Sequence, residues 1–274
     1  MSNKIEIKPM GSYFELDSEG YIINPASLEK IQSKWYPAIE DVIEIYKKVC
    51  SDKLINIYVR GSVAKGQAVE GISDLDTYAF IEDPLTSDPN EYKAIFNSYQ
   101  ETIEKYKEEL EHKYNFISEI EFQIHPKKRV PKEFIMLSQS VCVFGEPFEI
   151  SKLKPGKDLA LHSPGFTKFL IGLEEFFNKD TTPERNKMKC AWVMKRFLRT
   201  GFEICMERSG RYTRDLYKCY ETFIEYYPEK EPQMREILEL AINPTSDKQK
   251  IKQVVSNIGP WLVEEIKINF ITKF

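Results

Sequence analysis

Two short stretches decide how this sequence is interpreted: Tyr58-Val-Arg-Gly-Ser-Val-Ala-Lys-Gly66 and Ile72-Ser-Asp-Leu-Asp-Thr-Tyr78. The residue pattern predicts a strand over 54–59 that runs into a glycine-rich turn, and a second strand over 75–81. Side chains two residues apart on a strand point to the same face of a sheet. Asp74 and Asp76 therefore project together, while Leu75 between them points into the core.

The pair of aspartates indicates a site for a hard cation. Two carboxylates held side by side repel each other unless a cation lies between them. Mg²⁺ suits them, because it binds through one or two carboxylates together with substrate phosphates. Gly61 lets a phosphate approach the backbone, and Ser62 can donate its N–H and O–H groups to that phosphate. A lone Asp-x-Asp is usually a solvated strand, but the Gly-Ser turn at this distance favours the functional interpretation.

This arrangement resembles the DNA polymerase β-type nucleotidyltransferase superfamily, in particular its small bacterial members that modify aminoglycosides and other antibiotics. The family pattern is a hydrophobic strand, Gly-Ser or Gly-Gly, a spacer, and then Asp-hydrophobic-Asp or Glu; here the spacer runs over the eleven residues 63–73. Thr77 departs from the pattern, since the family usually has an apolar residue there. The resemblance implies an α+β fold: an N-terminal mixed β-sheet nucleotidyltransferase domain with flanking helices, followed by a C-terminal α-helical bundle.

The resemblance also implies a third carboxylate on a later strand, in Ser118-Glu-Ile-Glu-Phe-Gln-Ile124. Glu119 and Glu121 alternate onto one face, so either could point toward the aspartates. We favour Glu121, because its apolar neighbours would make a central strand, where a charged residue needs a reason. Glu119, nearer the start of the strand, could be plain surface.

From the resemblance, two Mg²⁺ ions about 3.5–4 Å apart would bridge the carboxylates and a triphosphate. The expected catalytic and metal-binding residues are Asp74, Asp76 and Glu121. The expected nucleotide-binding residues are Gly61, Ser62 and Lys65.

The chain divides into two parts with different patterns. Its 274 residues suggest two domains, at roughly 150 residues each. Over 1–150 strands alternate with helices, with further strands expected over 116–124 and 141–144 and a helix over 91–113. Residues 151–157 are a plausible linker, and the segment 158–274 reads as a helical, substrate-binding bundle. In that segment Thr182 and Thr213 are expected to cap helices, and Pro232 and Pro260 to open them.

Cations gather at two places in the helical segment. Lys195, Arg196 and Arg199 lie within one turn, and Arg211-Tyr-Thr-Arg-Asp215 adds more charge at a helix start, where Asp215 suits the helix dipole. A triphosphate needs such cations. A solvated helix face remains the simpler interpretation of any single one. In the resembling proteins the acceptor lies in a cleft between the two domains.

Composition restricts the class of protein. The apolar fraction of 42% and charged fraction of 30% are those of a globular protein, and no run of residues predicts a membrane span. Five cysteines without a CxxC pair favour a reduced, cytoplasmic setting. The net charge is −4, divided into −7 before Gly165 and +3 from there on, which argues against a nucleic-acid partner.

The sequence therefore predicts a Mg²⁺-dependent enzyme that transfers a nucleoside monophosphate, from ATP or another NTP, to a hydroxyl of a small-molecule acceptor. The leading alternative is a nucleotidyltransferase-like antitoxin or regulatory partner, which can keep the fold without turnover. A second alternative is a tRNA-directed nucleotidyltransferase, against which the absence of a strongly basic stripe weighs. The sequence predicts neither the acceptor, which could be an antibiotic, nor the oligomeric state.

Overall fold

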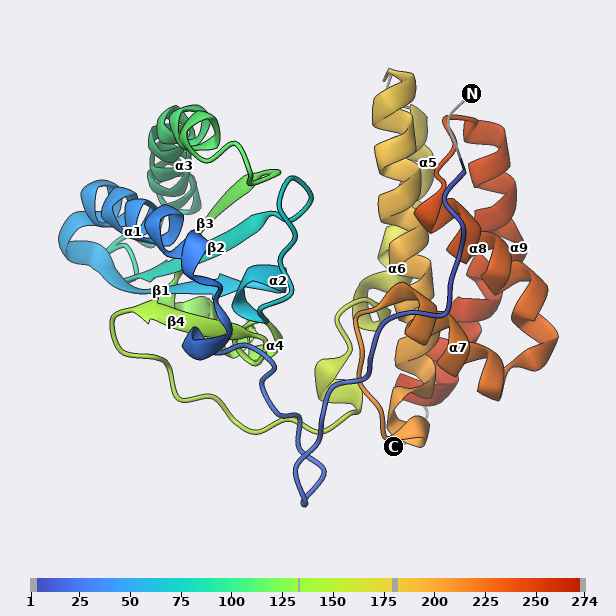
Figure 1. The fold of residues 1–274 in the computed structure, drawn as a ribbon. Helices are drawn as coiled ribbons and strands as arrows, with labels where there is room; N and C mark the ends of the chain where they lie inside the picture. The colour runs from blue at the N-terminus through green and yellow to red at the C-terminus, as the bar shows by residue number, and fades with distance from the viewer. Residues whose placement is uncertain (1–3, 133, 179–181, 272–274) are drawn as a thin grey trace. The chain divides into compact units, whose positions relative to one another are not determined.

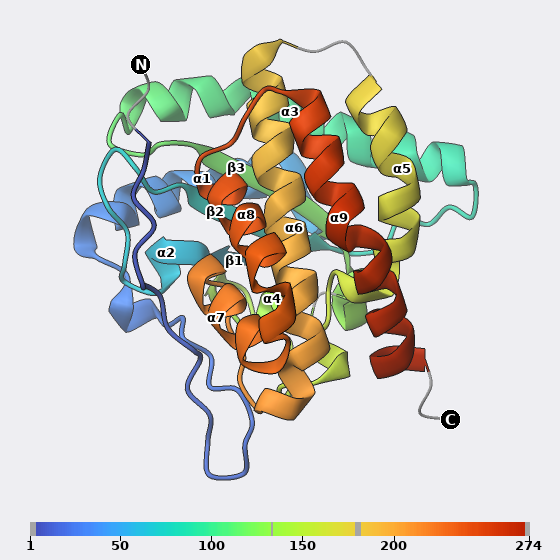
Figure 2. The ribbon, with the colours of Figure 1, turned by 90° about the vertical axis from the view of Figure 1, so that its right-hand side faces the viewer.

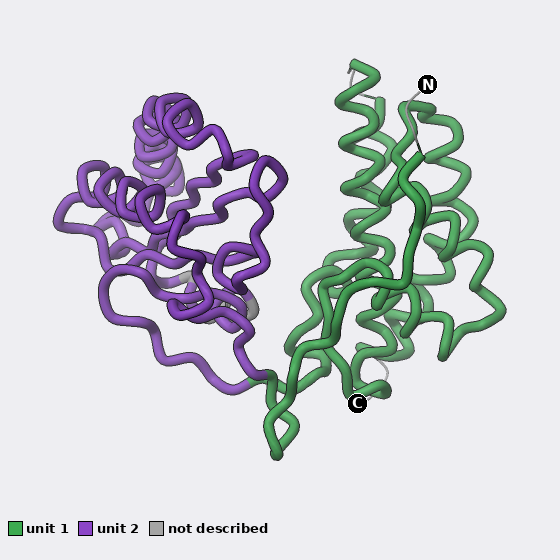
Figure 3. The backbone as a smooth tube through the Cα atoms, in the orientation of Figure 1, with its two compact units in different colours: residues 1–22, 153–274 green, residues 23–152 purple. Residues whose placement is uncertain are grey.

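The computed structural model describes residues 4–132, 134–178 and 182–271. The chain forms two compact units (Figure 3): unit 1 comprises residues 1–22 and 153–274, and unit 2 comprises residues 23–152. The first 22 residues, which the sequence analysis grouped with the strands, thus cluster with the C-terminal helices. Unit 2 holds the sheet and unit 1 holds helices (Figure 1), so the predicted α+β class is confirmed.

Unit 2 is built on a four-stranded mixed sheet with the order β3-β2-β1-β4. The strands are β1 (Leu54–Arg60), β2 (Leu75–Ile81), β3 (Ile120–Pro126) and β4 (Ser140–Phe144). β1 pairs antiparallel with both β2 and β4, whereas β2 and β3 are parallel. A parallel pair needs a crossover, which the long helix α3 (Pro89–Lys113) supplies.

β3 lies at the edge of the sheet and is not the central strand that the sequence analysis expected. Its apolar residues pack on one face only, which is sufficient for an edge strand covered by helices. Side chains from those helices also bond to its backbone. The Ile120 N–H donates to Glu111 of α3 at 3.0 Å, and the Gln123 N–H donates to the Tyr46 hydroxyl at 3.0 Å. These bonds tie β3 to the two helices.

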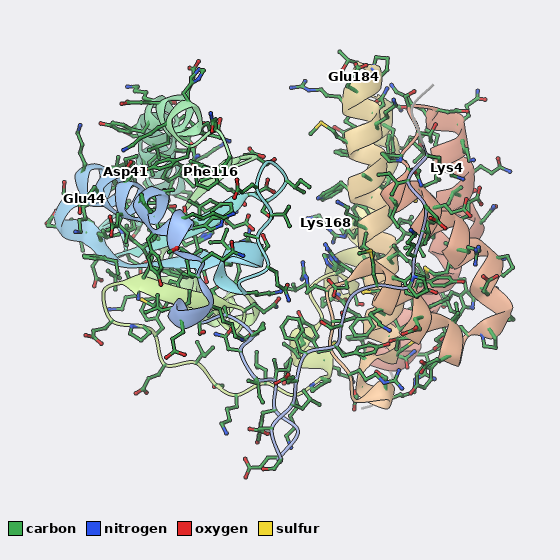
Figure 4. All side chains as sticks on the ribbon, viewed as in Figure 1. Lys4, Asp41, Glu44, Phe116, Lys168 and Glu184 are labelled. Carbon is green, nitrogen blue, oxygen red and sulfur yellow. The ribbon has the colours of Figure 1, made fainter. Side chains whose placement is uncertain are left out.

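Two helices cover one face of this sheet (Figure 1), α3 and α1 (Tyr36–Cys50). The apolar side chains of that face and of the two helices form one core, which includes Trp35, Val42, Ile57, Leu75, Ala79, Ile103 and Ile120. Asp41 on α1, labelled in Figure 4, accepts hydrogen bonds from Lys113 at 2.6 Å and from the Tyr114 hydroxyl at 2.7 Å. The two helices are therefore tied together at one end of the core.

The opposite face of the sheet carries aromatic side chains and leads to the polar residues considered below. Tyr58, Tyr78 and Phe80 are buried there and contact one another, with the rings of Tyr58 and Tyr78 stacked at 5.3 Å. Two short helices complete unit 2, α2 (Gly61–Ala64) and α4 (Phe134–Leu137). The aromatic cluster gives this face a rigid base at one end, and polar side chains occupy the other end.

Unit 1 is a bundle built around the longest helix, α6 (Pro183–Ser209), shown in Figure 2. The helices that pack in the same core are α5 (Phe166–Asn178), α7 (Leu216–Tyr226), α8 (Glu231–Ile242) and α9 (Lys248–Ile266). Short 3-10 turns lie at Leu28–Lys30, Ser33–Trp35, Ser51–Lys53, Lys127–Lys132, Lys157–Leu159, Ser163–Gly165 and Pro228–Lys230, and a π-helical turn at Lys267–Ile271. None of the helices in the described part of the chain has the length and apolarity that crossing a membrane requires.

Two predicted helix boundaries in unit 1 hold and two do not. Thr182 caps α6 by accepting from the Arg185 N–H, and Pro232 lies in the first turn of α8. Pro260, however, lies inside α9 instead of opening a helix. A proline inside a helix removes one backbone hydrogen bond. Pro260 lies on the exposed side of α9, where water can replace that bond, while Ile258 and Leu262 anchor the helix in the core. Asp215 rather than Thr213 is the N-cap of α7.

Residues 4–22 run along unit 1 as an extended strap (Figure 1). The Ser12 N–H donates to the Asp215 carboxylate at 2.8 Å, and the Phe14 N–H donates to the Tyr212 carbonyl at 2.8 Å. Asp215 therefore anchors the strap, which explains why it is not free to act as a simple side-chain cap. Within the strap, a turn at Gly20 is closed by an antiparallel bridge between Leu16 and Ile22.

A hydrogen-bond network of two buried hydroxyl groups, those of Tyr46 and Thr77, joins α1 to β2 and β3. The Tyr46 hydroxyl lies 3.1 Å from the Thr77 hydroxyl and bonds to both the N–H and the carbonyl of Gln123, at 3.0 and 3.2 Å. Thr77 in turn donates to the Glu121 carbonyl at 2.7 Å. Thr77 is buried, so its departure from the family's apolar residue is explained by these bonds.

We predict that Tyr46→Phe lowers the free energy of unfolding by about 1–3 kcal/mol, because it leaves the buried Gln123 N–H without a partner. Urea denaturation followed by circular dichroism measures the change. Tyr99→Phe, which removes a hydroxyl that shows no hydrogen bond to the described residues, is the matched control. Equal stability of the two variants would contradict a stabilising role of the Tyr46 hydroxyl.

Candidate functional site

The turn at the end of β1 is shaped by Gly61. This residue has φ +75°, a left-handed conformation that glycine adopts without strain. A Cβ atom built on it would lie 2.5 Å from Oδ2 of Asp76. Gly61 therefore makes room for the Asp76 carboxylate, a reason for glycine that the sequence analysis, which considered only the approach of a phosphate, did not identify.

The three predicted carboxylates come from two parallel strands. Asp76 on β2 is directly paired in register with Glu121 on β3. Asp74 precedes β2 and is exposed, while Leu75 between the aspartates is fully buried, as the alternation predicted. The structure therefore brings Asp76 and Glu121 together, with Asp74 near enough to raise the pKa of Asp76 by its charge.

Glu119, the alternative third carboxylate, points elsewhere. Its carboxylate accepts from Lys107 of α3 at 2.7 Å, and 59% of its side chain is exposed. The structure thus places Glu121 beside Asp76 and Glu119 in a surface ion pair, although the reason given from the sequence, a central strand, was wrong.

The pKa values of the two paired carboxyl groups are shifted in opposite directions. Burial raises the pKa of Asp76 to about 7, and a hydrogen bond with Glu121 adds to the rise while Arg60 opposes it. Burial also favours the neutral form of Glu121, but hydrogen bonds with Asp76 and Gln123 and the charge of Arg60 prevail and lower its pKa. Asp76 therefore holds a proton more strongly than Glu121 does.

Three residues that the sequence analysis did not single out surround this pair. Arg60 donates to Glu121 Oε2 at 3.1 Å and lies 3.6 Å from Asp76 Oδ1. The Gln123 amide donates to Glu121 Oε1 at 2.6 Å, and its oxygen lies 3.2 Å from the His125 ring. Alternation from Glu121 along β3 could have identified Gln123 and His125, and Arg60 is the residue directly before Gly61.

The donor groups fit a magnesium ion held mainly by two carboxylates. In the described part of the chain, no three or more His, Cys, Asp and Glu side chains are grouped so as to hold a metal. Asp76 and Glu121 nevertheless supply adjacent hard oxygen atoms, and Asp76 keeps a proton that a divalent cation would displace. A Mg²⁺ ion commonly takes one or two carboxylates and completes its shell with water and phosphate.

The predicted phosphate-binding residues lie directly beside the pair. Ser62 is in the first turn of α2, and its carbonyl accepts from the Gln67 N–H at 2.8 Å. Lys65 follows the last residue of α2 and is half-buried. Gly61, Ser62 and Lys65 thus form one short segment after β1.

Comparison with known proteins supports this interpretation of unit 2. Residues 42–143 match the family model described as the nucleotidyltransferase domain, a range that contains every predicted site residue. Residues 42–143 form a nucleotidyltransferase domain. No curated protein matches the sequence significantly.

Among solved structures, the chain is similar to spectinomycin adenyltransferase from Enterococcus faecialis, crystallised with ATP and spectinomycin. The sequences are 15% identical, the TM-score is 0.45, and the match covers 85% of this chain and 99% of the other.

Outside the nucleotidyltransferase domain, unit 1 carries a cationic cluster that we define as His162, Arg196, Arg199 and Arg214. The charges of the three arginines all act on His162, and those of Arg199 and Arg214 act on each other. Arg196 stacks over the Phe169 ring at 4.2 Å. Among the described residues, Arg196 Nε, Arg199 Nε and His162 Nε2 are buried without a hydrogen-bond partner.

Glu203 lies close to the cationic cluster, and its charge acts on Arg196 and Arg199. Its carboxylate accepts from the N–H groups of Leu161, His162 and Ser163 and from the Ser163 hydroxyl, at 2.7–3.1 Å. It therefore ties the loop that carries His162 to α6. Arg211, which the sequence analysis included among the cations, pairs instead with Glu225 at 3.0 Å. What remains among the described residues is a partly buried group of cations.

We predict that Gly61→Ala and Gly71→Ala lose similar free energies of unfolding, about 1–2 kcal/mol each, because both glycines have a left-handed φ, +75° and +72°. A Cβ atom added to Gly71 would meet nothing within 4 Å, so Gly71→Ala is a matched control. Only Gly61→Ala displaces Asp76, and calorimetry with ATP and Mg²⁺ should show about tenfold or more weaker binding, equivalent to about 1.4 kcal/mol. Equal affinities in both variants would rule out this role of Gly61.

We also predict a pH effect at His162, where burial and the three arginines lower the pKa from 6.5 to about 3. The unfolded chain binds a proton that the folded protein does not, so stability is complete above pH 6.5 and decreases as the pH falls toward 3. Relative to His162→Gln, the wild-type protein should lose up to about 1.4 kcal/mol per pH unit in that range. Denaturant unfolding between pH 4 and 7 measures this difference, and parallel curves would contradict it.

Proposed function

We propose that this protein transfers a nucleoside monophosphate, AMP from ATP, to a hydroxyl group of a small-molecule acceptor and releases pyrophosphate. The observation that carries the proposal is the register pair of Asp76 and Glu121 beside the Gly61–Ser62 turn. Two acidic side chains held in register beside a glycine turn repel each other when both are ionised. They fit a site that binds a cation and phosphates together.

Asp74, Asp76 and Glu121 would hold Mg²⁺ in this site. When bound, Mg²⁺ would neutralise charge on the triphosphate and favour ionisation of the acceptor hydroxyl. Ser62 would donate its N–H and hydroxyl to phosphate oxygens, while Gly61 makes room for the Asp76 carboxylate beside them. Lys65, directly after α2, would add positive charge to the same segment.

Glu121 is the residue that we assign as proton acceptor. Its pKa is lowered, so it is ionised at neutral pH, whereas the pKa of Asp76 is raised. The acceptor hydroxyl would pass its proton to Glu121 as its oxygen bonds to the α-phosphorus atom. The bond from that phosphorus to the bridging oxygen breaks, and pyrophosphate leaves. Gln123 and Arg60 hold both oxygen atoms of Glu121 in place.

The retention of both aspartates, Ser62 and Glu121 favours turnover over a purely regulatory role. The cationic cluster of unit 1 also bears on the acceptor, because a site of three arginines and a histidine suits an anionic group and disfavours a polycation. All five cysteines are free thiols, which supports a reduced, cytoplasmic setting.

Incubation of the protein with Mg²⁺ and each labelled NTP, against aminoglycosides, lincosamides and cell metabolites, tests the proposal directly. Mass spectrometry should detect an acceptor heavier by one nucleoside monophosphate, together with pyrophosphate. Stable co-purification with a small toxin and no adduct from any acceptor would instead favour the regulatory alternative.

We predict that Asp76→Asn and Glu121→Gln each lower the turnover number by about 10²-fold or more, because each removes a charge that acts on the reacting groups. Glu119→Gln is the matched control from the residue just before the same strand, since it breaks only the surface pair with Lys107, and it should retain turnover within about twofold. Pyrophosphate release measures all three. Turnover lost in Glu119→Gln and kept in Glu121→Gln would reverse the assignment.

A further inference from the structure

Arg60 occupies an unusual place for a cation, at the end of β1 and between two carboxylates. Its guanidinium group donates to Glu121 Oε2 at 3.1 Å and lies 3.6 Å from Asp76 Oδ1. Only 30% of the Arg60 side chain is exposed. This contact is therefore a half-buried bridge between the two strands that carry the acidic pair, unlike the exposed ion pairs on the helices of unit 2.

The bridge uses the oxygen atoms that a metal ion would need. Glu121 Oε1 accepts from the Gln123 amide at 2.6 Å and Oε2 accepts from Arg60. Asp76 faces the same guanidinium group with Oδ1, while Oδ2 lies against Gly61. A cation cannot bind both carboxylates on the side that Arg60 occupies unless the guanidinium group moves away, because like charges at this distance repel.

Resting on the proposed function, we propose that Arg60 is an internal counter-cation which neutralises Asp76 and Glu121 until a divalent cation displaces it. Metal binding then exchanges one cation for another, so that the net gain in charge attraction without nucleotide is small. Metal without nucleotide should therefore bind weakly.

The place of Arg60 in the chain suggests where the displaced guanidinium group finds its next partner. Arg60 is covalently next to Gly61 and Ser62, the segment proposed to bind phosphates. A planar guanidinium group is well suited to phosphate oxygens. A nucleotide thus offers Arg60 a new anion at the moment when the metal takes its carboxylates, and the two ligands should bind cooperatively.

The test uses Mn²⁺ as the probe, with free Mn²⁺ counted by electron paramagnetic resonance in the full-length protein. Titrations are made with and without α,β-methylene-ATP, which cannot be cleaved at the reacting bond. We expect Arg60→Met to bind Mn²⁺ without nucleotide about two- to tenfold more tightly than the wild type, the range of one partly exposed ion pair. We also expect the increase in Mn²⁺ affinity caused by the nucleotide to be smaller in Arg60→Met.

Two further variants make the result decisive. Lys107→Met removes one positive charge from a different ion pair of unit 2, the one between Lys107 and Glu119. This variant should bind Mn²⁺ as the wild type does. Arg60→Lys keeps the charge without the planar fork and should lie between wild type and Arg60→Met, which covers the case that Arg60→Met does not fold.

The outcomes separate this proposal from the proposed function. If Asp76→Asn loses Mn²⁺ but neither Arg60 variant binds it more tightly than the wild type, the displacement of Arg60 is refuted and the metal site stands. If Lys107→Met gains affinity as much as Arg60→Met, the effect is one of general charge and the proposal is also refuted. If no protein binds Mn²⁺ with or without nucleotide, the proposed function itself fails.

Discussion

The hydrogen bond from the Thr77 hydroxyl to the Glu121 carbonyl joins β2 to β3 inside the core and fixes the register on which the site depends. Side chains alternate along a strand, so a slip of one residue would turn Glu121 to the opposite face of the sheet. The Tyr46 hydroxyl strengthens this restraint, since it bonds to Thr77 and to both backbone groups of Gln123. A helix on one face thus sets the position of a carboxylate on the other.

The fixed register imposes an electrostatic cost that the surrounding residues reduce. Asp76 and Glu121 face each other in a half-buried place, where two ionised carboxylates would repel strongly. The protein responds in two ways: the pKa of Asp76 rises so that it keeps a proton, and Arg60 lies against both groups. Such an arrangement keeps the fold stable without a metal and leaves the pair ready to exchange its cations.

Features that depend on neighbouring residues were predicted correctly from the sequence. Features that depend on pairing between distant segments were not. The bounds of β2, the burial of Leu75 and the Thr182 cap follow from a few neighbouring residues. The edge position of β3 does not, because its apolar residues would also suit a central strand. Likewise, Glu121 and Arg60 meet only through the pairing of three strands, and Pro260 stays helical because the core around α9 outweighs its helix-breaking tendency.

The two units leave opposite charge requirements unsatisfied. In unit 2, Asp76 and Glu121 compete for one proton and one guanidinium group, so a further cation there would be stabilising. In unit 1, three arginines act on His162, while the charge of one carboxylate, Glu203, acts on Arg196 and Arg199, so a further anion would be stabilising. Each requirement arises from charges within one unit, so it depends on the packing of that unit and not on the Gly61–Ser62 turn.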